Sequence, residues 1–140
     1  MTVRVLAIAV LLAVCSAANA AAQSDKQGVT YRAPSGTTLR LILDSANVGP
    51  DISLGELTFA PNGDSGEHTH GAIEIFYVLS GELEHVVNGK SQILKPGMVG
   101  YVKPPDKIRH KTGPAGARVV VMWVPGAEAG KIISRWTKEP

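Results

Sequence analysis

The segment Gly66-Glu67-His68-Thr69-His70-Gly71-Ala72-Ile73-Glu74 carries the side chains in this sequence that are best suited to chemistry. Residues two apart on a β-strand face the same way, so His68 and His70 are expected to direct both imidazoles toward one point. Gly71-Ala72 can then reverse the chain, which lets Glu74 enter from the adjoining strand. Two neutral imidazoles and a carboxylate suit a divalent transition metal (Fe, Mn, Co, Ni, Cu or Zn) and leave positions open for water, oxygen or substrate.

His110 is the expected fourth ligand of this metal. It follows the rigid Pro104-Pro105 segment on a later strand, from which it could lie opposite the first two histidines. The chain has four histidines, and the remaining one, His85, lies on a hairpin-like strand, so it is expected at the surface. The predicted metal ligands are His68, His70, Glu74 and His110.

The rest of the chain predicts an all-β sandwich or barrel, because short apolar or alternating runs are separated by turn residues. Turns are expected at Ser80-Gly81, Asn88-Gly89 and Lys95-Pro96-Gly97. Residues 126–131 are expected to form a single helical turn at most. The expected strands are residues 37–43, 52–59, 74–79, 82–87, 91–94, 98–102, 118–124 and 132–136.

Two of these strands, residues 75–79 and 119–123, are apolar at both odd and even positions, so both of their faces are expected to be covered. One face would lie in the core. The other could be covered by a second sheet, by the N-terminal segment or by another subunit, and the last alternative predicts a homodimer.

Length and charge limit the domain organisation and the partners. A chain of 140 residues is expected to form one domain with one site. The formal net charge of +2 comes from 14 basic and 12 acidic residues without a Lys/Arg stripe, so nucleic acid is not an expected partner.

The N-terminal segment has the features of a secretory signal peptide. An uncharged, largely apolar run at residues 5–14 follows a single basic residue and precedes the cleavage pattern Ala18-Asn19-Ala20. Residues 1–22 are therefore expected to be removed, which predicts a periplasmic or secreted protein with no membrane segment after cleavage. A lipoprotein signal ending at Cys15 is the alternative, but bulky Val14 stands where such signals need a small residue.

The spacing of the candidate ligands resembles that of a known superfamily. His68, His70, Glu74 and Gly81 satisfy the pattern His-x-His-x3-Glu-x6-Gly, which is similar to the first motif of the cupins. The Pro96-Gly97 turn followed by His110 resembles their second motif. The resemblance to small single-domain cupins implies a jelly-roll β-barrel over residues 23–140. It also implies one metal held inside by three histidines and a glutamate, and a small-molecule ligand or substrate.

This resemblance leaves the reaction open, because one fold serves many functions. The first expectation is a metal-dependent dioxygenase similar to quercetin-dioxygenase-like cupins, in which Glu74 is ligand and catalytic base. The alternatives are a non-redox metal-dependent isomerase or lyase and a non-catalytic module that binds a small ligand. Tyr101 is a further candidate, since its hydroxyl could donate to a bound oxyanion.

Overall fold

A computed structural model describes residues 28–140, so the predicted signal peptide and Cys15 lie outside the described residues. All strand pairings are antiparallel, in the order β5-β4-β7-β3-β2-β1-β8, and β6 pairs with β4. The prediction of an all-β jelly roll is confirmed. The elements are β1 (Val29–Arg32), β2 (Thr38–Leu43), β3 (Ser53–Phe59), β4 (Ile73–Val87), β5 (Lys90–Leu94), β6 (Val99–Val102), β7 (Ile108–Val124), α1 (Ala127–Ile133) and β8 (Thr137–Lys138).

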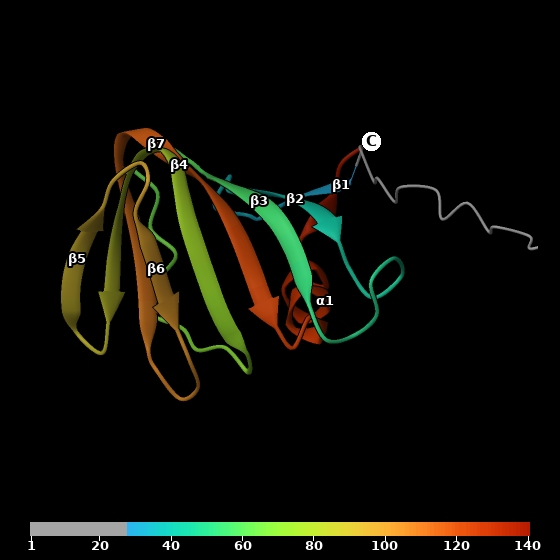
Figure 1. Ribbon diagram of the computed structural model, residues 1–140. Helices are drawn as coiled ribbons and strands as arrows, with labels where there is room; N and C mark the ends of the chain where they lie inside the picture. Colours follow the sequence, from blue (N-terminus) through green and yellow to red (C-terminus); the bar gives the residue numbers. More distant parts are fainter. Residues whose placement is uncertain (1–27) are drawn as a thin grey trace, which may run out of the picture.

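The two longest strands, β4 and β7, run side by side through the barrel and bend together (Figure 1). Their pairing shifts register between Val78 and Ser80 and again between Gly81 and Leu83. Each β-bulge inserts an unpaired residue and increases the local twist of the strand. The expected turn at Ser80-Gly81 was therefore wrong: residues 74–79 and 82–87 form one continuous, bent strand.

The bend also changes which side chains of β4 face the core. Phe76 and Val78 are fully buried in the first half of the strand, whereas Leu83 and His85 are buried in the second half. The buried positions thus change from even to odd numbers across the bulges. A one-residue shift in a strand exchanges its two faces, so the extra residue between Val78 and Ser80 accounts for this change.

The C-terminal segment was predicted incorrectly as a strand at residues 132–136. It forms α1 and a following turn, and α1 packs against β7. Buried Ala129 and the half-buried Ile132, Ile133 and Trp136 all contact the core, at positions i, i+3, i+4 and i+7 of a helical stripe. No helix within residues 28–140 is long and apolar enough to cross a membrane.

Candidate metal centre and cavity

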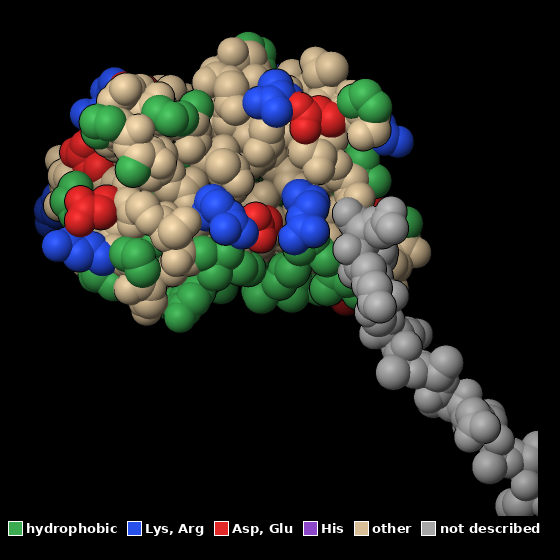
Figure 2. Space-filling view, turned by 90° about the horizontal axis from the view of Figure 1, so that it is seen from above, with side chains coloured by type: hydrophobic (Ala, Val, Ile, Leu, Met, Phe, Trp, Pro, Cys, Tyr) green, Lys and Arg blue, Asp and Glu red, His purple; other side chains and the backbone are tan. Residues whose placement is uncertain are grey.

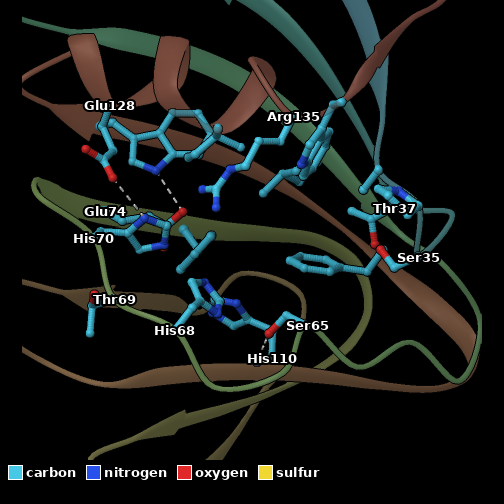
Figure 3. Close-up of a pocket in the computed structure, with 18 residues that line it drawn as sticks. Ser35, Thr37, Ser65, His68, Thr69, His70, Glu74, His110, Glu128 and Arg135 are labelled. Carbon is cyan, nitrogen blue, oxygen red and sulfur yellow. Dashed lines mark hydrogen bonds and ion pairs between the residues drawn. The ribbon is translucent and has the colours of Figure 1, made fainter.

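A cavity of about 670 Å³ lies inside the barrel, with walls from β3, β4, β7 and α1 and from the loops that precede β2 and β4. This volume falls within the roughly 300–1,000 Å³ of typical small-molecule sites. The structure brings all four predicted ligands to this cavity, where Figure 3 shows them on one side of it. They are His68, His70, Glu74 and His110.

His70 and Glu74 form the closest pair in this group. His70 Nε2 lies 2.9 Å from Glu74 Oε2, and both side chains are almost completely buried. Neither atom has a partner in hydrogen-bond geometry, although they are so close. Two metal-ligand atoms at right angles, with bonds of about 2.1 Å, would also lie about 3.0 Å apart. The contact therefore has the spacing of two donor atoms that share one ion.

Trp123 on β7 fixes the orientation of the Glu74 carboxylate. Its indole Nε1 donates a hydrogen bond of 2.8 Å to Glu74 Oε1, and the bond is buried. The register of the sheet places the two residues directly opposite each other on β7 and β4. Because Oε1 accepts this bond, Oε2 is the oxygen left for His70 and the cavity.

Glu128 on α1 lies on the other side of the His70 ring, and sequence reasoning did not identify it. Its Oε1 lies 3.4 Å from His70 Nδ1 and accepts a hydrogen bond of 3.2 Å from the Gly71 N–H. Its Oε2 accepts a hydrogen bond of 3.0 Å from Lys131 Nζ. A carboxylate on the outer nitrogen of a histidine is the usual support for a metal-binding imidazole. Burial alone lowers the pKa of His70, but the carboxylates of Glu74 and Glu128 outweigh burial and raise this pKa above its usual value.

His68 is held by the backbone rather than by a carboxylate. It lies outside the regular strands, where its N–H and C=O pair with Ile108 in an isolated bridge. Its Nδ1 lies 3.0 Å from the Gly66 carbonyl oxygen, which can only accept, so Nδ1 carries the proton. Nε2 is then the basic nitrogen, as in a metal-binding tautomer. The His68 ring meets His70 edge-on, with 4.9 Å between ring centres.

His85 is buried in contact with His110, so its predicted surface position was wrong. Only 5% of His85 is exposed, and its Nδ1 lies 3.1 Å from His110 Nε2. The register change in β4 turns His85 inward. It is directly opposite His110 in the sheet, and the two rings are stacked.

The protons of this histidine pair follow from its surroundings. His85 Nε2 lies 3.3 Å from the Tyr101 carbonyl oxygen and must donate to it. Neutral His85 then accepts at Nδ1, so His110 Nε2 is the donor. Burial, followed by the neighbouring imidazoles, lowers the pKa of His110 well below its usual value. In this arrangement the Nε2 of His110 is committed to His85.

These contacts decide how well the residues fit a metal ion. Residues 28–140 contain no group of three or more His, Cys, Asp or Glu side chains already arranged to hold one. His110 Nε2 is hydrogen-bonded to His85. The unpartnered His70 and Glu74 atoms fit a cation, and so does the supported His68 ring. His70 and Glu74 therefore already have the spacing of two ligands, His68 would have to move closer to join them, and His110 fits only after leaving His85.

Tyr101 lies away from these residues. Its side chain is on β6 and the residue is 65% exposed, and it is not part of the cavity wall. The proposed role of its hydroxyl at a bound oxyanion was therefore wrong. The cavity is lined instead by several residues that sequence reasoning did not select, among them Leu57, Phe59, Glu128, Ile132, Arg135 and Trp136.

Comparisons with known proteins agree with this architecture. Residues 55–125 match the family model described as a cupin domain. No curated protein matches the chain.

Several solved structures are similar in fold. An RmlC-like cupin from Shewanella frigidimarina has 17% identity and a TM-score of 0.63, over 73% of this chain and 88% of that one. A predicted oxalate decarboxylase from Thermotoga maritima has 18% identity and a TM-score of 0.61, over 74% and 96%. The polyketide cyclase RemF from Streptomyces resistomycificus has 24% identity and a TM-score of 0.58, over 71% and 68%. At these identities the likeness concerns the fold alone.

Proposed function

Since this chain belongs to the cupin superfamily, we propose that it is an exported, metal-binding cupin that acts as a metal-dependent dioxygenase on a small organic molecule. The main support is that His70 Nε2 and Glu74 Oε2 lie 2.9 Å apart at the wall of the cavity, and that neither atom has a hydrogen-bond partner. His68, His70 and Glu74 would hold the ion, with His110 as the fourth ligand. Export is supported by the sequence of residues 1–22 alone.

A redox-active ion such as Fe(II) would supply electron exchange with oxygen and Lewis acidity toward the substrate. The protein's own groups bind and orient the substrate. Phe59 and Phe76 offer apolar surface to its carbon skeleton. Trp123 holds Glu74 Oε1, so Oε2 is the oxygen that would bind the ion and that, once released from it, would accept a proton from the substrate. Glu128 keeps the His70 ring in place through Nδ1.

Oxygen consumption by the purified protein tests this proposal. With Fe(II) bound, we expect oxygen uptake in the presence of a phenolic compound or a small carboxylic acid. The Zn(II) form should be inactive because Zn(II) has no redox chemistry. Loss of the carboxylate in Glu74→Gln should lower the rate at least about 100-fold, the lower range for loss of general base catalysis. No oxygen uptake by the Fe(II) form over a broad panel of both compound classes would contradict the proposal.

A second candidate is a non-redox lyase or isomerase. It is favoured by two proteins of similar fold, a predicted oxalate decarboxylase and a polyketide cyclase. Turnover that survives replacement of Fe(II) by Zn(II) would support this candidate. Tight binding of a small ligand, without turnover in either the Fe(II) or the Zn(II) form, would support the third candidate, a non-catalytic binding module.

The proposal includes a homodimer, formed through one apolar surface of the barrel. This hydrophobic outer face comes from neighbouring strands, since Tyr77 pairs with Val99 and Ile73 pairs with Val124. Large exposed apolar patches mark interaction sites, and a patch that meets its own copy gives a twofold interface. Figure 2 shows hydrophobic side chains gathered along one edge of the molecule. The face consists of Ile73, Tyr77, Leu79, Val99, Tyr101 and Val124.

Charges placed in this face are expected to separate the dimer. We expect the double variant Tyr77→Glu/Val99→Glu to be monomeric in light scattering coupled to size-exclusion chromatography, while the unmodified protein has twice the monomer mass. Buried like charges without partners are costly, so the interface should not form. Val48→Glu is the matched control, because Val48 is 42% exposed but lies in the loop between β2 and β3. A monomeric unmodified protein would contradict the homodimer.

A further inference from the structure

Arg135 differs from the other arginines that the structure describes. Arg32, Arg40, Arg109 and Arg118 each form an ion pair with a carboxylate. The Arg135 side chain forms no hydrogen bond or ion pair with residues 28–140. It follows α1 and lines the cavity, and Figure 3 shows its guanidinium extending inward toward the side where His70 and Glu74 lie.

The carboxylates of the cavity wall do not neutralise this cation. Glu74 accepts a hydrogen bond from Trp123 on one oxygen and lies against His70 with the other. Glu128 is held by Lys131, Gly71 and His70. Both acids of the cavity therefore lie against groups other than Arg135, and Arg135 adds a positive charge that is free to meet a ligand.

Much of the remaining wall is apolar. Around the guanidinium, the cavity offers aromatic and aliphatic side chains from β3, β4, β7 and α1 and the turn after it. Such a surface binds a carbon skeleton, whereas a small number of placed polar groups fix its orientation. These side chains are Leu57, Phe59, Phe76, Trp123, Ile132 and Trp136.

We propose that the cavity binds a small organic carboxylate, whose anionic group is held by Arg135 and whose apolar body lies against the aromatic wall. This inference rests on the proposed function and names its substrate class. The planar guanidinium matches a carboxylate through two parallel hydrogen bonds, which a neutral amide cannot reproduce. Because the guanidinium extends toward His70 and Glu74, the carbon atoms next to the carboxylate would lie beside the candidate metal centre.

Two matched probes test the charge requirement: 3-phenylpropanoate and its neutral counterpart 3-phenylpropanamide. The chain has two tryptophans, and both Trp123 and Trp136 line the cavity, so their fluorescence reports binding. We expect the unmodified protein to bind the carboxylate about tenfold more tightly than the amide, which corresponds to one charge-assisted contact. This preference should disappear in Arg135→Met and return in part in Arg135→Lys. Arg118→Met, which removes a surface arginine paired with Glu56, should keep it.

The titrations are made with chelated protein and with Zn(II)-loaded protein, so that the carboxylate site and the metal site are tested separately. A preference that depends on Arg135 in the chelated protein supports this inference even where no metal binds. The inference would be overturned if Arg135→Met and the unmodified protein preferred the carboxylate over the amide equally. It would also be overturned if the unmodified protein bound neither probe or bound both with the same affinity. Normal Zn(II) content in Arg135→Met would show that the variant is folded and that the metal centre does not depend on this residue.

Discussion

Replacing His70 with alanine is expected to lower the affinity for Zn(II) at least about 10–100-fold, the range seen when even a supporting residue of a metal site is lost. The variant removes one ligand of the ion. It also leaves Glu74 Oε2 without its neighbour and Glu128 without the imidazole that it supports. Competition with a coloured chelator measures the affinity directly. Zn(II) is suitable because it binds the same nitrogen and oxygen donors without redox chemistry.

Thr69→Ala is the control for this measurement. Thr69 lies between the two histidines and lines the cavity, but it offers no imidazole or carboxylate. Its affinity for Zn(II) should match that of the unmodified protein. His68→Ala should resemble His70→Ala, because His68 presents a basic Nε2. Unchanged affinity in both histidine variants would eliminate the metal centre.

His110→Ala decides how many ligands the ion has. A loss as large as in His70→Ala would mean that His110 Nε2 leaves His85 and binds the ion. An unchanged affinity would limit the ligands to His68, His70 and Glu74. The 3.1 Å contact between His110 and His85 in the unmodified protein would then have a structural role only. The two outcomes differ because an imidazole nitrogen cannot both donate its proton to His85 and coordinate a metal.

Much of the barrel could be predicted from the sequence because its signals are local. A two-residue turn between strands needs positive φ angles, and Asn88-Gly89 supplies them, with φ of 50° and 78° in the β4–β5 hairpin. Short alternating runs then give the strands on either side. The short strands β1 and β8 were missed, since they hold only four and two residues and carry little periodicity.

The candidate site was predicted in part. The spacing of His68, His70 and Glu74 identified three residues that do lie together at the cavity. His85 was wrongly expected at the surface because it lies on a hairpin-like strand, and strict alternation from Phe76 and Val78 would also put it outside. The bulges reverse that alternation, and their position depends on pairing with β7 rather than on β4 alone.

Glu128 and Arg135 reach the cavity through tertiary packing of the C-terminal segment. Nothing in their immediate neighbours indicates which barrel residues they will approach, since Gly71 and Glu128 are 57 positions apart in the chain. The helix that carries Glu128 was underestimated, since residues 126–131 were expected to form a single helical turn at most, although Ala129, Ile132 and Ile133 have helical spacing. Residues 132–136 were expected to be a strand as one of the short apolar or alternating runs, and packing against the core favours the helix instead.

Gly81→Ala is expected to lower the free energy of unfolding by about 2–5 kcal/mol, as the sum of a left-handed backbone penalty and overpacking. Gly81 has φ of +75°, and a methyl group there would overlap the Gly116 carbonyl oxygen and lie 2.9 Å from Ala117 Cα. Both neighbours are backbone of β7, so neither can move away as a flexible side chain would. Urea unfolding of the chelated protein measures the loss without a contribution from metal binding.

Gly89→Ala separates the two parts of this penalty. Gly89 has a similar φ of +78°, but an added methyl group would meet nothing within 4 Å, so this variant should lose only the backbone part, about 1–2 kcal/mol. The excess loss in Gly81→Ala then measures how tightly β4 and β7 cross at the bulges. Equal losses would mean that the crossing is loose. A tight crossing has a functional consequence, because the extra residue that β4 inserts between Val78 and Ser80, next to Gly81, is what turns both Glu74 and His85 toward the interior of one barrel.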